Sequence, residues 1–98
     1  MTRKIRLRRQ ARTEIDEAAK WYDEQRDGLG AEFVEAYKNL TEKMRERPES
    51  YPAALGNLRK ASFGRFPYIL FYKIYARDVL IVACVHERRD PRHWQSRV

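Results

Sequence analysis

Two runs of apolar side chains in the second half of the chain dominate its hydrophobic pattern. They cover residues 66–75 and 79–86, and three turn-type residues at 76–78 separate them. β-Branched and aromatic residues on both sides of a short turn predict an antiparallel β-hairpin. Both faces of each strand are apolar, whereas a sheet with one wet face alternates apolar with polar side chains. Both faces are therefore expected to be covered, and the pattern does not tell which face the rest of the chain covers.

Helical periodicity replaces the strand pattern between residues 10 and 47. Apolar residues recur there at spacings of three or four, first at Ala11, Ile15, Ala18 and Tyr22 and then at Phe33, Tyr37, Leu40 and Met44. The segment 28–30, Gly-Leu-Gly, is expected to stop the first helix, and Pro48 to end the second at Arg47. Because the link is so short, the two helices are expected to pack antiparallel on one core.

The remaining segments predict short strands and a loop. Residues 4–7 alternate polar and apolar side chains, as an edge strand does. Residues 48–58 contain turn-forming residues and predict a surface loop, and residues 58–62 predict a short strand. The order β-α-α-β-β-β over residues 1–98 predicts a single α+β domain, with an antiparallel helical hairpin on one face of a small antiparallel sheet. The other face is then an apolar patch open to a partner.

Composition and charge narrow the function classes. No segment resembles a signal peptide or a membrane span, and a lone cysteine cannot form an intramolecular disulfide, so we expect a cytoplasmic protein. The net charge is +6 over residues 1–12, −5 over residues 13–50 and +6 over residues 51–98. If the two basic ends meet in the fold, they form a positive surface suited to nucleic acid or to an acidic protein. Otherwise the charge serves solubility alone.

Basic and aromatic residues that could bind a target lie at the end of the last predicted strand and in the strand and turn before the hairpin. The predicted target- or nucleic-acid-binding residues are Arg59, Lys60, Arg65, His86, Arg88, Arg89, Arg92 and Trp94. Arginine binds phosphate in a bidentate manner, and an aromatic ring beside it can stack on a base. In a metal-free ribonuclease, His86 would be the acid or base, with Arg65 and Arg89 as phosphate clamps. The segment 89–91, Arg-Asp-Pro, is equally typical of a local turn.

Metal and cofactor sites are not expected. Cys84 and His86 are two residues apart on a strand and share a face, but no further side chain stands at metal-ligand spacing. A buried structural cysteine is the commoner case. The Gly28-x-Gly30 pair lacks a preceding strand and the rest of a dinucleotide-binding fingerprint. The sequence predicts neither a metal nor a cofactor.

The whole pattern resembles the RelE/ParE superfamily of type II toxin–antitoxin toxins, and in particular its ParE-like plasmid stabilisation proteins. The most specific segment is 86–91, His-Glu-Arg-Arg-Asp-Pro, which is similar to the HxRRDP ending of ParE-like members. The resemblance implies a cytoplasmic bacterial toxin, neutralised by an antitoxin that lies along its hydrophobic surface, in a homodimer or a toxin–antitoxin heterotetramer. The hairpin residues expected to bind that antitoxin are Tyr68, Leu70, Tyr72, Ile74, Val79 and Ile81.

The resemblance leaves two activities open. RelE-like members are ribosome-dependent mRNA endonucleases, whereas ParE-like members inhibit DNA gyrase by binding it. Pro67 and Tyr68 stand where many of the nucleases have a Tyr-Arg-type pair, and no C-terminal tyrosine follows His86. We therefore expect a growth-inhibiting, ParE-like toxin that binds gyrase and is not an enzyme. RelE-like RNA cleavage is the alternative, and a non-toxic nucleic-acid binder or a degenerate family member is a further one.

Overall fold

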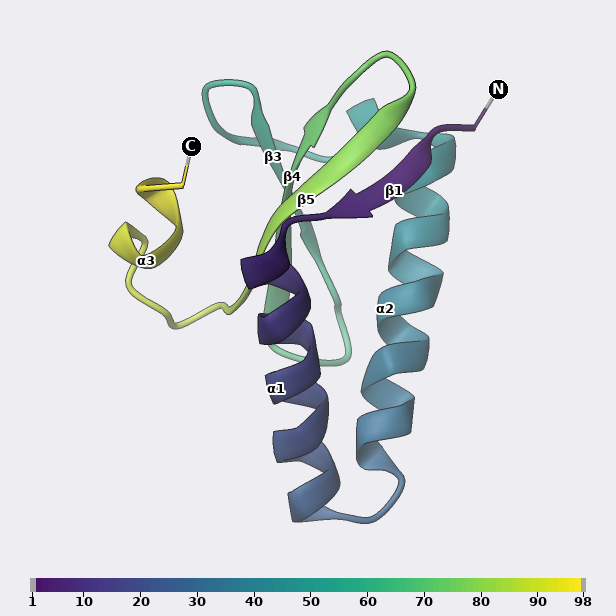
Figure 1. Ribbon diagram of the computed structural model, residues 1–98, viewed down its shortest axis with the longest axis vertical. Coiled ribbons are helices and arrows are strands. Elements are labelled where there is room, and N and C mark those ends of the chain that lie inside the picture. Colours follow the sequence, from purple (N-terminus) through teal and green to yellow (C-terminus); the bar gives the residue numbers. More distant parts are fainter. Residues whose placement is uncertain (1, 98) are drawn as a thin grey trace.

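A helical hairpin covers one face of a five-stranded sheet in the computed structural model, which describes residues 2–97 (Figure 1). The elements are β1 (Lys4–Leu7), α1 (Arg9–Gln25), α2 (Leu29–Glu46), the 3₁₀ turn η1 (Pro48–Ser50), β2 (Ala53–Leu55), β3 (Leu58–Ser62), β4 (Tyr68–Ile74), β5 (Asp78–His86) and α3 (Arg92–Gln95). Within residues 2–97, none of the helices has the length and apolarity needed to span a membrane. The α+β fold predicted from the sequence is confirmed.

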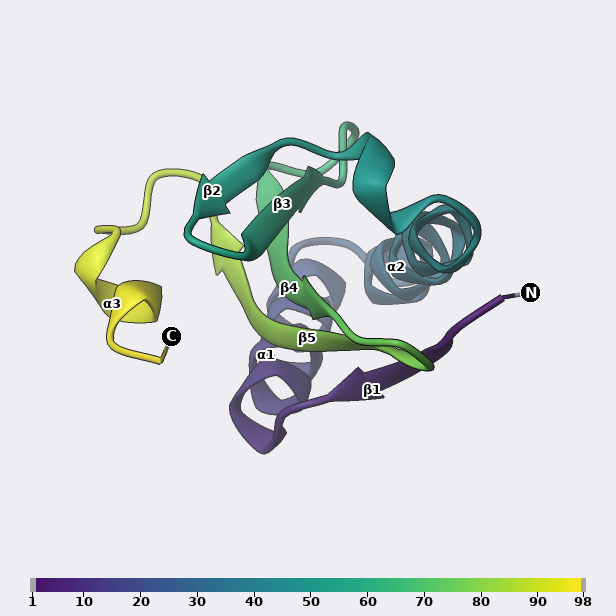
Figure 2. The ribbon, with the colours of Figure 1, turned by 90° about the horizontal axis from the view of Figure 1, so that it is seen from above.

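The strands lie in the order β1-β5-β4-β3-β2. All neighbouring pairs are antiparallel except β1 and β5, which run parallel because the helical hairpin carries the chain back before the sheet resumes. The segment predicted as a loop between α2 and β3 contains η1 and the short edge strand β2. The two basic segments meet in the sheet, since β1 pairs with β5 and the Arg8 N–H donates a hydrogen bond to the Ile81 carbonyl oxygen at 3.0 Å. Figures 1 and 2 show β1 beside β5.

The link between α1 and α2 depends on Asp23 and two glycines. Gly28 has a φ of 89°, in the left-handed region that glycine adopts without strain. The Asp23 carboxylate accepts hydrogen bonds from the N–H groups of Gly28, at 3.0 Å, and Gly30, at 3.2 Å, and so satisfies free donors at the start of α2. Gly30 lies inside α2 rather than in a stop signal. It allows a close approach of the helices, because a Cβ there would lie 2.5 Å from the Ala19 carbonyl oxygen.

The main core lies between the helices and one face of the sheet. The two predicted apolar stripes both face it, and the buried helix residues are Ala11, Ile15, Ala18, Phe33, Leu40 and Met44. The buried Tyr72 hydroxyl donates a hydrogen bond to the Pro48 carbonyl oxygen at 2.7 Å. This bond satisfies the buried hydroxyl and ties β4 to η1, which follows α2.

The sheet face predicted to bind an antitoxin is the face that the helices cover. Leu70, Tyr72, Val79 and Ile81 are fully buried in this core, and Tyr68 and Ile74 pack at its margin. Alternation along β4 and β5 places all these side chains on one face, but it carries no information about which face the helices choose. Leu70, Tyr72, Val79 and Ile81 are therefore core residues, and the antitoxin prediction for these four is corrected here, whereas Tyr68 and Ile74 are only partly buried.

The second face of the sheet is covered largely by the chain itself. Its apolar cluster consists of Leu58, Phe71, Val82, Ala83, Val85 and Trp94, all buried. Trp94 of α3 stacks on Phe71, with ring centroids 4.0 Å apart and planes 21° apart. Figure 2 shows α3 on the opposite side of the sheet from α2. The prediction of an uncovered face is thus corrected, because the segment beyond β5 folds back and buries Trp94 on it.

Replacing Gly30 by Ala tests the close approach of α1 and α2. Alanine favours a helix by about 1 kcal/mol over glycine, but the new Cβ meets a backbone oxygen that cannot rotate away. We expect Gly30→Ala to lower the free energy of unfolding by about 1–3 kcal/mol in urea denaturation. The exposed neighbour Ala31 provides the control, since Ala31→Ser should stay within about 0.5 kcal/mol. A stabilised Gly30→Ala protein would contradict the packing described.

Candidate functional site

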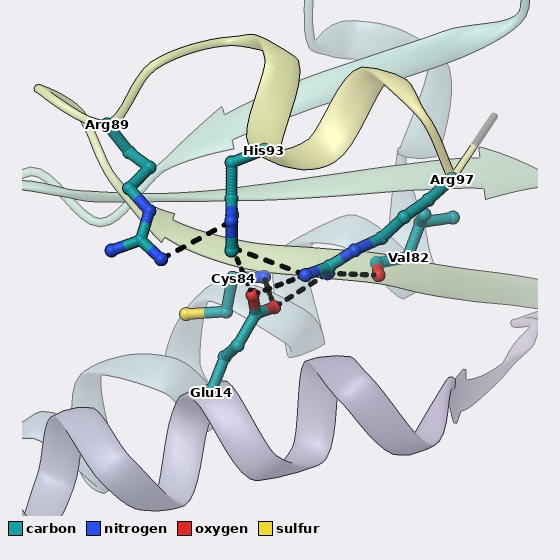
Figure 3. A network of polar contacts seen from close by, with 6 residues as sticks. All are labelled: Glu14, Val82, Cys84, Arg89, His93 and Arg97. Atoms are coloured by element: carbon teal, nitrogen blue, oxygen red, sulfur yellow. Dashed lines mark hydrogen bonds and ion pairs between the residues drawn. The ribbon is translucent and has the colours of Figure 1, made fainter.

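A carboxylate on α1 holds the segment of residues 87–97, the tail, in place (Figure 3). Glu14 accepts two hydrogen bonds from the Arg97 guanidinium, at 2.9 and 2.8 Å, and one from His93 Nε2 at 2.9 Å. The backbone N–H of Cys84 donates a further one at 3.0 Å. The side chains of Glu14 and Arg97 are only 15% and 11% exposed. An ion pair so far removed from water is favourable only when hydrogen bonds satisfy its charges, as they do here.

The carboxyl group of Glu14 is ionised in this setting. Burial alone would raise its pKa, but the hydrogen bonds from Arg97, from the Cys84 N–H and from His93 stabilise the carboxylate and lower the pKa below its ordinary value of 4.5. Burial, with the Glu14 charge close by, raises the pKa of the Cys84 thiol. A buried thiol held in the protonated form is a poor nucleophile, as buried structural cysteines are.

Both histidines of the site take part in hydrogen bonds within the chain. His93 donates from Nε2 to Glu14, while its Nδ1 lies 3.3 Å from a nitrogen of Arg89, which can only donate. His86 Nδ1 accepts the backbone N–H of Arg88 at 3.1 Å. His93 Nε2 also lies 3.3 Å from a guanidinium nitrogen of Arg97, so both ring nitrogens of His93 are in contact with charged groups of the chain.

Two pockets flank the turn of residues 86–89, which a hydrogen bond from the Arg89 N–H to the His86 carbonyl closes. The first pocket, of about 250 Å³, lies between α1 and the ends of β4 and β5; its polar and aromatic walls include Glu17, Trp21, Tyr68, His86, Arg89 and His93. The second pocket, of about 270 Å³, lies between the second sheet face and α3; its walls include Ala53, Lys60, Ile69, Phe71, Val85 and Trp94. His86 and Arg89 line both, so the turn forms a ridge between them.

The first pocket offers hydrogen-bond donors beside an exposed aromatic ring. His86, Arg89 and Tyr68 present polar groups there, and Trp21 of α1 is 53% exposed at its rim. Burial raises the pKa of the Tyr68 hydroxyl, so it stays protonated and can donate. Within residues 2–97, no group of three or more His, Cys, Asp or Glu side chains is placed to hold a metal ion. The arrangement is suited to binding through hydrogen bonds and charge.

The predicted target-binding residues divide into two groups. Those on or beside the turn are Lys60, His86, Arg88, Arg89 and Arg92. Those with structural contacts are Arg59, which donates to the carbonyl oxygens of Glu49 and Tyr51, Arg65, which forms an ion pair with Glu32, and Trp94, which is buried on Phe71. The candidate catalytic trio is thus not assembled, because Arg65 lines neither pocket while His86 and Arg89 line both.

Sequence reasoning missed the residues that hold the tail. Glu14 is 83 residues from Arg97 and 79 from His93 along the chain, and no local pattern joins them. One signal was present: Glu14 lies between Ala11 and Ala18 on the buried side of α1, beside Ile15. A carboxylate at the border of an apolar helix stripe needs a buried partner, although the sequence does not say which.

The fold and site define a class of small α+β protein, with a helical hairpin on one sheet face and an arginine-rich turn after the last strand. The family model described as "ParE toxin of type II toxin-antitoxin system, parDE" matches residues 5–91, and the chain belongs to this family. The resemblance to RelE/ParE toxins is therefore confirmed.

A solved structure titled "Chromosomal ParDE TA system from P. aeruginosa" has a similar fold. Its TM-score is 0.64 at 12% sequence identity, and the match covers 87% of this chain and 96% of that chain. At this identity the likeness shows the fold alone. No curated protein sequence matches this chain.

Replacing Glu14 by Gln tests the role of its charge. The variant keeps the shape but leaves the Arg97 guanidinium without a counter-charge, so we expect the free energy of unfolding at pH 7 to fall by about 3 kcal/mol. The pKa of Glu14 is lower in the folded chain than its ordinary value of 4.5. Its stabilising contribution is therefore complete above pH 4.5 and is lost as the pH falls through the folded pKa.

Urea denaturation between pH 7 and pH 3 measures this contribution. The difference in stability between wild type and Glu14→Gln should shrink as the pH falls, while the exposed control Glu24→Gln should follow wild type throughout. A difference that stays constant with pH would show that the ionised Glu14 carboxylate does not hold the tail.

Proposed function

We propose that this chain is the toxin of a type II toxin–antitoxin system, that a cognate antitoxin neutralises it, and that it arrests growth by binding DNA gyrase rather than by cleaving RNA. Membership of the ParE toxin family supports the first two parts. The choice between gyrase and RNA rests on one observation: Arg65, proposed as a phosphate clamp beside His86, is paired with Glu32 and lines neither pocket with His86.

Metal-free RNA cleavage needs one group to take the 2′-hydroxyl proton and another to protonate the leaving oxygen. His86 and His93 each use Nδ1 to accept a hydrogen bond, from the Arg88 N–H and from Arg89. Arg65, the second proposed phosphate clamp, forms an ion pair with Glu32 and lines neither pocket. The raised pKa of Tyr68 makes its hydroxyl a poorer acid. The first pocket therefore suits a binding function better than general acid–base catalysis.

Exposed arginines provide the surface for a protein target. Arg88, Arg89 and Arg92 are exposed on the turn and tail, and Arg92 forms an ion pair with Asp90 at 2.7 Å. Among the ion pairs within residues 2–97, neither Arg88 nor Arg89 has an acidic partner. Such charges accelerate association with an acidic surface and add specificity. We assign target binding to the turn of residues 86–89 and to Arg92.

A supercoiling assay with purified DNA gyrase tests the target. We expect the wild-type chain to inhibit supercoiling and the Arg88→Glu variant to need about tenfold more protein for the same inhibition, because a reversed rim charge slows association. Arg77→Glu reverses an exposed charge at the far end of the hairpin and should inhibit like wild type. A folded, growth-arresting chain that leaves gyrase unaffected would contradict the proposal.

Cleavage of ribosome-bound mRNA tests the alternative activity. We expect neither wild type nor His86→Ala to cleave it, because the second phosphate clamp that such cleavage would need, Arg65, is paired with Glu32 away from His86. Primer extension on translated mRNA, in the presence and absence of the protein, provides the measurement. Cleavage by wild type that His86→Ala abolishes would establish the RelE-like activity instead.

A further inference from the structure

We propose that the antitoxin docks in the second pocket, between β2 and α3, through a segment in which acidic residues flank one large apolar side chain. This inference rests on the proposed function, because it names the place and the chemistry of the antitoxin contact. It also moves that contact to the sheet face opposite the one expected from the sequence, where Leu70, Tyr72, Val79 and Ile81 are buried under the helices.

The floor of the second pocket is preformed from apolar side chains, of which Phe71, Val85 and Trp94 are almost fully buried and Ile69 is half-buried. Ile69, Phe71 and Val85 come from β4 and β5, and Trp94 from α3 closes one side. The volume of about 270 Å³ is just below the range of roughly 300–1,000 Å³ typical of ligand pockets, so the space suits one large side chain better than a cofactor. A buried apolar anchor of this kind supplies much of the binding energy at a protein interface.

The mouth of the pocket is kept open by small residues on an edge strand. Ala53 and Ala54 of β2 line it, and β2 is the last strand of the sheet. The edge of β2 also offers unpaired backbone groups beside the pocket, to which an extended segment can add hydrogen bonds. An incoming chain thus meets an apolar anchor point and an open sheet edge together.

Charge defines the flanking residues of the partner. Lys60 is exposed on β3 at the pocket wall, Arg89 is exposed on the turn, and Lys73 lies on the same sheet face next to Phe71 along β4. Glu87 is the one acidic residue that lines this pocket. A rim with this excess of positive charge complements aspartate and glutamate, and it disfavours basic segments.

The positive rim would also attract nucleic acid, but the floor of the pocket is not suited to binding a base. Binding a single strand without base readout requires aromatic faces on which bases stack. Trp94, the aromatic residue of the tail, is only 8% exposed and already stacks on Phe71. The observations therefore favour an acidic protein segment. An occupant here would also cover Arg89, so one contact would both bind the antitoxin and block the proposed target surface.

Two variants of the full chain test the site with the protein encoded next to this chain's gene as the binding partner. Ala53→Trp fills the mouth of the pocket, and Lys60→Glu reverses the rim charge. We expect each to weaken binding by about tenfold or more in isothermal titration calorimetry. The control Arg77→Glu, exposed at the opposite end of the hairpin, should stay within about twofold of wild type.

A fluorescence titration locates the contact directly. The chain has two tryptophans, so Trp21→Phe leaves Trp94, at the wall of the second pocket, as the sole tryptophan reporter of this chain. With a tryptophan-free variant of the partner, we expect its emission to change on binding. If Ala53→Trp does not fold by circular dichroism, Lys60→Glu and this titration decide the matter.

The outcomes separate this inference from the proposed function. Wild-type affinity in both variants would overturn the docking site while the toxin–antitoxin pairing stands. So would a Trp94 fluorescence emission that does not change when the partner binds. No binding between the wild-type chain and its neighbour would overturn the pairing, and the docking site with it. If the wild-type chain binds DNA, and Lys60→Glu loses that binding while keeping full antitoxin affinity, the rim is assigned to nucleic acid and the proposal is overturned.

Discussion

The hydrogen-bonded ion pair between Glu14 and Arg97 joins the first helix to the last residues described in the chain. Through it the tail returns across β5, and Trp94 reaches the second face of the sheet. The same carboxylate orients His93, whose other nitrogen accepts from Arg89. The walls of both pockets and the position of the basic turn therefore depend on one charge on α1. Because a carboxylate in that position is costly without partners, the tail and the helix stabilise each other.

This arrangement relates the two proposed contacts of the molecule. The turn of residues 86–89 is a ridge with a polar pocket on one side and an apolar pocket on the other. An antitoxin segment seated in the apolar pocket would lie against the arginines proposed to meet the target. Neutralisation would then follow from steric cover and charge neutralisation, with no change in the fold. The helical hairpin, which contains most of residues 13–50 with their net charge of −5, borders the ridge on the side of the first pocket, where Glu14 and Glu17 of α1 line the wall.

Local patterns predicted most of the elements correctly. The apolar stripes of α1 and α2, the hairpin of β4 and β5, and the strand at residues 58–62 follow from side-chain periodicity and from the residues that end each element. The family resemblance carried by residues 86–91 was equally local. What periodicity could not supply was the side of the sheet that the helices cover, because both faces of the hairpin are apolar.

Amino-acid order alone thus determined the helices, the main strands, the charge segregation and the group of basic residues after the last strand. Tertiary structure alone decided which apolar face became core, and which charged side chains bind other groups of the chain. Arg59, Arg65 and Arg97 look alike in the sequence to Arg88 and Arg89, but the first three bind carbonyl or carboxylate groups of the chain. The contacts that made this distinction span 8 and 10 residues for Arg59, 33 for Arg65 and 83 for Arg97. They depend on how the layers pack, which no local spacing encodes.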